Sequence, residues 1–109
     1  MYPRDSEDAH GDNEEYLSVG AFLDLVNESF LGVFVSVRGE VFGLEERRGI
    51  QYFSLKDSEG SGVMSCILFR SDSSRASVSI SEGMEVVVEG SPHIWKPRGK
   101  FSFRVSNLR

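Results

Sequence analysis

Residues 84–106 read MEVVVEGSPHIWKPRGKFSFRVS, and this stretch decides the fold of the chain. Apolar and polar side chains largely alternate on both sides of a turn that contains Pro97 and Gly99. Alternation with a period of two indicates strands, and proline and glycine between two strands indicate a hairpin turn. We therefore predict one strand over residues 84–90, a second over residues 101–106, and a β-hairpin that joins them.

The tip of this hairpin, residues 93–101, brings together the only tryptophan of the chain and three cations within six residues: Trp95, Lys96, Arg98 and Lys100. A flat aromatic ring beside mobile positive charge suits a polyanion that also has flat faces, such as single-stranded nucleic acid. The alternative is a surface turn in which proline and glycine set the backbone and the charges keep the tip soluble. The tip alone leaves both interpretations open.

A helix is predicted near the start of the chain, beginning after Ser18 and ending at Gly32. Serine is a favourable N-cap residue, and glycine commonly ends a helix. The apolar residues that recur between them at helical spacing are Phe22, Leu25, Val26 and Phe30. From residue 33 onward the period changes to two, so the helix precedes a β-domain.

Three more strands are predicted between the helix and the hairpin, over residues 33–42, 51–57 and 63–70. Gly39 interrupts the first of them on its inner face, where glycine permits a bulge or a sharp bend. The third is apolar on both faces, and we favour the phase that places Ile67 outward. The side chains assigned to the inner faces are Val33, Val35, Val37, Val41, Phe53, Leu55, Met64, Cys66 and Leu68, followed by Met84, Val86, Val88, Phe101, Phe103 and Val105 in the last two strands.

The segments between these strands are polar. Residues 43–49 predict a charged loop, residues 57–62 a hairpin turn, and residues 71–82 a connector with one helical turn. Five strands with a long connector between the third and fourth predict an all-β domain with one N-terminal helix, a five-stranded Greek-key barrel of the OB type. An open sheet covered by the helix is the alternative, but closure leaves fewer exposed edges in a small domain.

The net charge of −5 is concentrated at the N-terminus. Residues 1–16 contain six acidic residues and one basic residue, whereas residues 17–109 contain eleven of each. An acidic segment with few apolar residues is typical of a disordered tail, so we place the domain at residues 17–109. The chain has one cysteine, no membrane-length apolar run and no apolar signal segment, which together predict a cytoplasmic protein.

Six segments occur in an order and spacing that resemble one known family: residues 17–19, 37–41, 49–57, 66–70, 83–90 and 95–99. They are similar to the N-terminal OB domain of the large subunit of bacterial exodeoxyribonuclease VII. Val37-Arg38-Gly39-Glu40-Val41 resembles its Val-x-Gly-Glu-Ile, and residues 49–57 resemble its Gly-His-x-Tyr-Phe-x-Leu-Lys-Asp. Trp95-Lys96-Pro97-Arg98-Gly99 resembles its Tyr-x-Pro-Arg-Gly. The strand after this motif departs from the Tyr-Gln-Leu type that is common in the family.

The resemblance implies a single-stranded DNA-binding domain that guides DNA to a nuclease region outside this chain. It implies three partners: single-stranded DNA, the catalytic remainder of the exonuclease, and its small subunit. The residues themselves predict neither a cofactor nor a metal, because His10, His93 and Cys66 are too few for a metal site. No serine–histidine–acid arrangement and no phosphate-binding loop is recognisable, so we expect the chain to be non-catalytic on its own.

Ligands of OB domains lie across the second and third strands, between the first–second and fourth–fifth loops. The residues that this placement predicts at the nucleic-acid interface are Arg38, Phe42, Arg47, Arg48, Tyr52, Lys56, Ile67, Trp95, Lys96, Arg98 and Lys100. Two further hypotheses stay open at this point. One is a protein-docking module that uses the apolar side chains Phe42, Ile67 and Phe69, although we interpret Phe69 as structural. The other is an RNA-binding domain.

Overall fold

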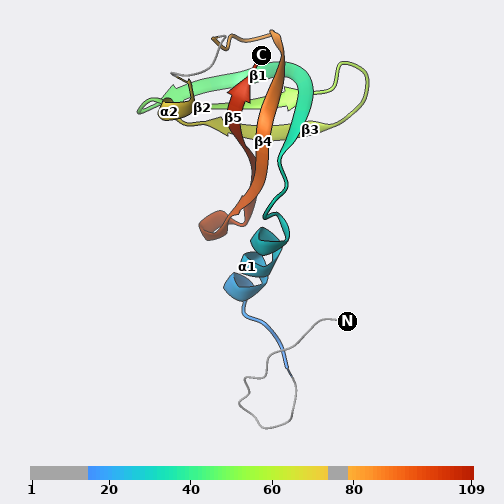
Figure 1. Ribbon diagram of the computed structural model, residues 1–109, viewed down its shortest axis with the longest axis vertical. Helices are drawn as coiled ribbons and strands as arrows, with labels where there is room; N and C mark the ends of the chain where they lie inside the picture. The colour runs from blue at the N-terminus through green and yellow to red at the C-terminus, as the bar shows by residue number, and fades with distance from the viewer. Residues whose placement is uncertain (1–14, 74–78) are drawn as a thin grey trace.

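The structure is a computed structural model that describes residues 15–73 and 79–109. Five strands form a closed barrel in the spatial order β1-β2-β3-β5-β4, with one helix, α1, outside it (Figure 1). The elements are α1 (Val19–Ser29), β1 (Val35–Arg47), β2 (Ile50–Lys56), β3 (Val63–Leu68), α2 (Arg70–Ser73), β4 (Glu85–Trp95), the 3-10 turn η1 (Lys96–Arg98) and β5 (Lys100–Leu108). The predicted connector contains the expected helical turn, α2, and residues 74–78 lie outside the described part.

The barrel closes as an OB fold does. The pairs β1–β2, β2–β3, β4–β5 and β1–β4 are antiparallel, and the short pair of β3 with β5 is parallel. In the parallel pair, Cys66 lies opposite Phe103 and Ile67 lies opposite Arg104. The predicted Greek-key barrel is therefore confirmed, and the open-sheet alternative is wrong. The expected acidic tail lies outside the described residues except for Glu15 and Tyr16.

Strand β1 is longer than the sequence pattern predicted. The expected loop over residues 43–49 is wrong, because β1 continues to Arg47 and reverses only at Arg48 and Gly49, both with positive φ. A bulge between Phe42 and Glu45 breaks the alternation on which the prediction rested. The Glu82 carboxylate accepts hydrogen bonds from the backbone N–H groups at the bulge, and these bonds lower the pKa of Glu82.

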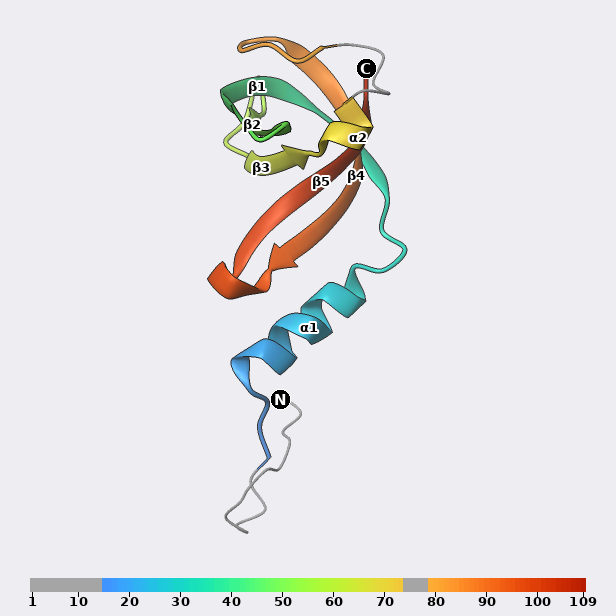
Figure 2. The same cartoon turned by 90° about the vertical axis from the view of Figure 1, so that its left-hand side faces the viewer.

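Strand β4 also continues past its predicted end at Gly90, to Trp95. Its register with β5 shifts between Glu89 and Gly90, which marks a second bulge. Up to Gly90 the strand pairs with β1 on one side and with β5 on the other. Beyond Gly90 the β4–β5 hairpin leaves the barrel and extends toward α1 (Figure 2). This projecting hairpin carries the aromatic and basic tip.

The core lies inside the barrel and confirms most of the predicted inner faces. The phase chosen for β3 is correct, because Cys66 and Leu68 are buried and Ile67 faces outward. Three predicted inner residues are largely exposed: Val33 at 37%, Val35 at 44% and Phe101 at 41%. They lie where β1 and β5 run out of the barrel, so the sheet cannot enclose them. The buried core consists of Val41, Phe53, Leu55, Cys66, Leu68, Val86, Val88, Phe103, Val105 and Leu108.

Helix α1 begins where the sequence predicts. The Ser18 hydroxyl accepts a hydrogen bond from the Ala21 N–H at 3.0 Å and caps the first turn. The helix ends at Ser29, and the chain reverses through Gly32, whose φ is +84°. Instead of covering the barrel, α1 lies along the projecting hairpin (Figure 2). No helix in the described ranges is long and apolar enough to cross a membrane.

Burial of the single cysteine makes the fold sensitive to high pH. Burial raises the pKa of the Cys66 thiol from its ordinary value of 9.0 to about 12. The unfolded chain therefore loses this proton above pH 9, whereas the folded chain keeps it. We expect the free energy of unfolding to be unaffected by this group below pH 9 and to fall by up to about 1.4 kcal/mol per pH unit between pH 9 and 12.

Urea unfolding at pH 8 and pH 10 measures this effect, with Cys66→Ala as the matched control. The variant starts from a lower stability, because it leaves a cavity in the core. It contains no thiol, however, so its stability should fall less between the two pH values than that of the natural chain. An equal fall in both proteins would contradict the assignment of the pH effect to Cys66.

Candidate nucleic-acid interface

The projecting hairpin has two different faces. Cross-strand pairing places His93 opposite Ser102 and Trp95 opposite Lys100, and paired residues share a face of the sheet. The residues of this outer face are Ser91, His93, Trp95, Lys100, Ser102 and Arg104. Ile94 and Phe101 form the next pair along the ladder and lie on the opposite face, toward α1. The hairpin therefore presents one basic and aromatic face and one apolar face.

The outer face of the hairpin forms one wall of a groove of about 680 Å³, here called the β2–β3 groove. Its floor comes from the outward side of β2 and β3, and its other wall from the bulged part of β1. The lining residues are Gly43, Glu45, Arg47, Tyr52, Phe53, Ser54, Ser65, Cys66, Ile67, Phe69, His93, Trp95, Lys100, Ser102 and Arg104. Three strands and a hairpin thus converge on a site rich in aromatic, hydroxyl and cationic groups.

Two arginines in this groove have their guanidinium groups over aromatic rings. The guanidinium carbon of Arg47 is 4.3 Å from the centre of the Tyr52 ring, and that of Arg104 is 4.6 Å from the centre of the Phe69 ring. Such cation–π contacts hold the charge in place without neutralising it. Arg47 also lies 3.8 Å from the Glu45 carboxylate, a weak and exposed ion pair. Fixed positive charge therefore borders the floor of the groove on both sides.

Trp95 stands at the end of the groove where the hairpin turns. Its side chain is 56% exposed, although it is the largest aromatic side chain in the protein. The turn after it is a single 3-10 turn, η1, which ends at Gly99 with φ of +58°. Lys100 lies directly across the hairpin from Trp95. An exposed indole beside a lysine can stack on a base while the ammonium group contacts a neighbouring phosphate.

Five of the eleven predicted interface residues lie in the β2–β3 groove: Arg47, Tyr52, Ile67, Trp95 and Lys100. The other six lie elsewhere. Three of these are engaged with protein groups: Arg38 pairs with Glu85 at 2.9 Å, Lys96 pairs with Asp24 at 2.9 Å, and Lys56 lies 5.5 Å from the centre of the Phe42 ring.

Arg48 occupies the β1–β2 turn, and Arg98 lies on η1 at the tip of the hairpin. Phe42 faces outward, as predicted, because it is paired with Ser54, which lines the groove, but Phe42 and Lys56 lie just beyond the lining residues of β1 and β2. The bulge that follows Phe42 turns Arg47 toward the groove. Position along the strand, and not residue type, therefore separates the predicted residues that line the groove from those that do not.

The groove also contains residues that the prediction left out of the interface, among them His93, Arg104 and Phe69. Arg104 could have been found from the sequence, since it alternates with the inward residues Phe103 and Val105 and must therefore point outward. Phe69 was interpreted as structural, yet its ring supports Arg104 inside the groove. His93 shares the outer face with Trp95, and the same alternation indicates it.

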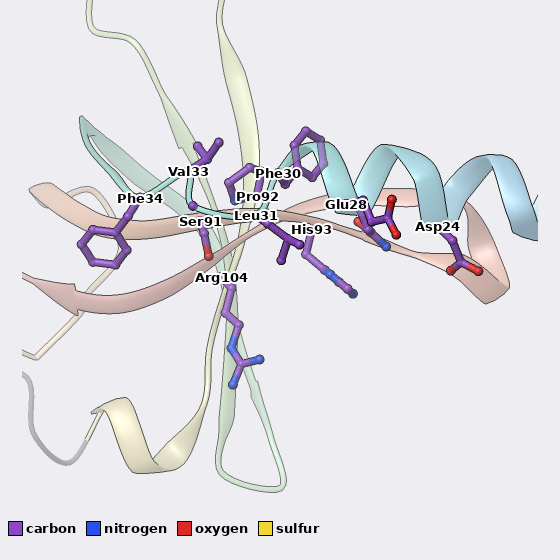
Figure 3. A pocket seen from close by; sticks show the side chains of 12 residues that line it. Asp24, Glu28, Phe30, Leu31, Val33, Phe34, Ser91, Pro92, His93 and Arg104 are labelled. Carbon is purple, nitrogen blue, oxygen red and sulfur yellow. The ribbon is translucent and has the colours of Figure 1, made fainter. Parts of the chain in front are cut away.

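A second hollow of about 780 Å³ lies between the end of α1 and the free side of β4 (Figure 3). Its exposed apolar side chains include Leu31 and Phe34, which are 78% and 60% exposed. Asp24 and Glu28 line it from α1, while Arg104 points away from the helix. Two carboxylates make this hollow less suitable for a phosphate backbone than the β2–β3 groove.

Among residues 15–73 and 79–109, no group of three or more histidine, cysteine, aspartate or glutamate side chains is arranged to hold a metal ion. The Cys66 thiol is buried and its pKa is raised, so it is not a reactive nucleophile at neutral pH. The groove therefore offers stacking surfaces, hydroxyl groups and positive charge. These are the features with which a protein binds nucleic acid.

The chain belongs to the family of OB-fold nucleic-acid-binding domains, whose model matches residues 17–109. Among curated proteins it is similar to exodeoxyribonuclease 7 large subunits, as the sequence motifs predicted. It is 40% identical over 79 residues to the Helicobacter pylori protein, which covers 71% of this chain and 18% of the relative. It is 32% identical over 101 residues to the Lacticaseibacillus casei protein, which covers 89% of this chain and 22% of the relative.

The chain thus spans about a fifth of the length of these relatives. Solved structures support the fold. The OBody AM3L15 bound to hen egg-white lysozyme has a TM-score of 0.56 at 19% identity, with 72% of this chain and 75% of that chain covered. Asparaginyl-tRNA synthetase from Pyrococcus horikoshii has a TM-score of 0.53 at 16% identity, with 70% of this chain and 18% of that chain covered.

Proposed function

We propose that this chain binds single-stranded DNA in the β2–β3 groove and guides it to the nuclease region of a larger exodeoxyribonuclease VII-like assembly. The observation that carries the proposal is the pairing of each groove-side arginine with an aromatic ring, together with the exposed Trp95 at the groove's end. Bases can stack on exposed rings while phosphates meet cations held beside them.

The groove favours a single strand over a duplex. Stacking on the exposed Trp95 ring needs the flat face of a base, and a duplex hides those faces inside its own stack. Stacking and phosphate contacts do not distinguish one base edge from another. Binding should therefore tolerate changes of sequence. The preference for DNA over RNA is supported by the similarity to exodeoxyribonuclease 7 large subunits.

The same similarity supports a non-catalytic role for this domain. Phosphodiester hydrolysis would be performed by the remaining four-fifths of such a protein, and this domain would supply substrate binding. A small subunit would be a further partner of the assembly, and the cytoplasm its location. An isolated domain of this kind binds more weakly than the assembly, because linked sites add avidity.

Titration with a single-stranded oligonucleotide, followed by the fluorescence of Trp95, tests the proposal directly. We expect quenching by the single strand and little response to a duplex of the same sequence. An RNA strand of that sequence should compete less well than the DNA. Equal competition by RNA would contradict the proposed preference for DNA. If neither strand changes the Trp95 fluorescence at low salt, the proposal of nucleic-acid binding in this groove is wrong.

Binding should weaken steeply with salt. If Arg47, Lys100 and Arg104 each neutralise one phosphate, the logarithm of the affinity should fall with the logarithm of salt concentration with a slope of about −2. The affinity should then drop roughly 20-fold between 50 mM and 200 mM salt. Anisotropy of a labelled oligonucleotide measures this slope. A slope near zero would instead favour an apolar docking surface for a protein partner.

A further inference from the structure

The end of the hairpin that carries Trp95 lacks the support of the barrel. Strand β4 pairs with β1 only from Glu85 to Gly90, and from Ser91 to Trp95 its partner among the described strands is β5 alone. A two-stranded hairpin by itself is at best marginally stable in water. The other edge of β4 also presents backbone groups that need partners. Something outside the barrel must therefore fix this part of the groove wall.

Asn27 of α1 supplies these partners. Its side-chain oxygen accepts a hydrogen bond from the Ile94 N–H at 2.8 Å, and its side-chain nitrogen donates one to the Ile94 carbonyl oxygen at 3.1 Å. One amide side chain thus takes the place of a neighbouring strand. Pro92, two residues earlier in β4, has no N–H group to satisfy. Asn27 therefore satisfies the backbone groups of Ile94 on the free edge of the hairpin, and Pro92 leaves no N–H group there to satisfy.

Two other contacts lie on the same side of α1. The Asp24 carboxylate pairs with the Lys96 ammonium group at 2.9 Å, and the Phe30 ring meets the Phe101 ring edge to face at 6.5 Å. Positions 24, 27 and 30 are spaced by three residues, so they lie on one face of the helix. The helix is therefore attached to the hairpin at three successive points, and Asn27 is the middle one.

These contacts act on the residue next to the exposed tryptophan. Ile94 faces α1 and Trp95 faces the groove, because successive side chains of a strand point to opposite sides. Fixing both backbone groups of Ile94 therefore restricts where the Trp95 ring can lie. A ring that is already in place loses less conformational freedom when a base stacks on it.

We propose that Asn27 is a positioning residue for the nucleic-acid groove: α1 holds the hairpin from behind so that Trp95 is placed for stacking. This inference rests on the proposed function of the β2–β3 groove. Asn27 itself does not line that groove. Its substitution should therefore change binding without removing any group that contacts the nucleic acid.

The test compares Asn27→Ala with Ser29→Ala in the full chain. Ser29 is a matched control, because it lies on the same helix and its hydroxyl bonds only the Val26 carbonyl within that helix. We expect Asn27→Ala to weaken binding of a labelled single-stranded oligonucleotide about fivefold to tenfold. Ser29→Ala should bind as the natural chain does. Asn27→Asp keeps an acceptor for the Ile94 N–H but places a second carboxylate oxygen against the Ile94 carbonyl oxygen, so it should not restore the binding of the natural chain.

Amide hydrogen exchange without any nucleic acid separates positioning from general stability. We expect Asn27→Ala to speed exchange of the Ile94 amide at least about tenfold, while the amides of Phe53 and Leu55 in the barrel keep their rates. Faster exchange throughout the barrel, with binding reduced only by the unfolded fraction, would show a merely structural role. Unchanged exchange at Ile94 and unchanged affinity would also overturn the proposal.

The exchange result stands apart from the proposed function. If the natural chain binds no nucleic acid, the proposed function fails, yet exchange at Ile94 still reports whether Asn27 holds the hairpin. If the natural chain binds and Asn27→Ala binds equally well, the function stands and the positioning role fails. Should Asn27→Ala not fold, Asp24→Ala tests the same attachment through Lys96 and should weaken binding by a smaller factor.

Discussion

Replacing Gly90 with alanine is expected to lower the free energy of unfolding by about 3 kcal/mol or more. A Cβ atom at this position would overlap the carbonyl oxygen of Arg104, and it would lie 2.9 Å from the carbonyl carbon and 3.1 Å from the Cα of Val105. All of these are backbone atoms of β5, so no side-chain rotation relieves the clash. The β4–β5 pair would have to separate where the barrel ends and the hairpin begins.

Thermal unfolding followed by far-UV circular dichroism measures this effect, and Gly83→Ala is the matched control. Gly83 has a φ of +84°, but a Cβ atom there would meet nothing within 4 Å, so alanine costs only the backbone strain, about 1 kcal/mol. The melting temperature of Gly90→Ala should fall by roughly 10–20 °C, several times the shift of the control. Equal changes in melting temperature for the two variants would show that β4 and β5 can separate at Gly90 with less loss of stability than we expect.

Gly90 also shows why strand length was harder to predict than strand order. Alternation is a local property, and it correctly predicted five strands, the phase of β3 and the inward set around Val41 and Phe53. Three strands proved longer than predicted, β1, β4 and β5, and two of them contain a bulge. In β1 the extra residue follows Phe42, and in β5 it lies opposite the step from Glu89 to Gly90 of β4. A bulge adds one residue and reverses the alternation, and the neighbouring strand decides where it forms. When only one strand's sequence is considered, the break in alternation at a bulge therefore looks like the end of the strand.

The composition of the groove was partly predictable for the same reason. Tyr52 and Ile67 lie on unbroken strands, and simple alternation placed them correctly on the outer face. Arg47 lies beyond a bulge, and it was included in the predicted interface only because it was expected at the edge of a loop. The partners that engage Arg38 and Lys96 are Glu85 and Asp24, each far away in the sequence. Such pairings depend on tertiary structure and leave no local signal.

The location of α1 could not be inferred at all. Its apolar spacing predicted a helix correctly, but the same spacing would suit a helix packed on the barrel. One of the residues that attach it to the hairpin is Asn27, a polar residue within the apolar pattern, through its two hydrogen bonds to Ile94. The backbone groups of Ile94 are available to Asn27 only because β4 continues beyond its last pair with β1. A sequence pattern cannot show an unpaired edge that arises from the unequal lengths of two strands.

Replacing Trp95 with alanine is expected to give the largest loss of nucleic-acid affinity. Removing one base–aromatic stack costs roughly 1–3 kcal/mol, which corresponds to a dissociation constant about 5- to 150-fold higher. The side chain is 56% exposed and carries no part of the buried core, so the stability of the fold should change little. Anisotropy of a labelled single-stranded oligonucleotide measures the effect, because the variant has no tryptophan fluorescence.

Phe34→Ala is the matched control, since Phe34 is also a largely exposed aromatic residue but lines the second hollow beside α1. It should bind like the natural chain. The salt dependence of Trp95→Ala should keep its slope, because the substitution removes a stacking surface and leaves Arg47, Lys100 and Arg104 in place. A loss of affinity in Phe34→Ala with none in Trp95→Ala would move the binding site from the β2–β3 groove to the second hollow. The outer face of the hairpin would then need another role.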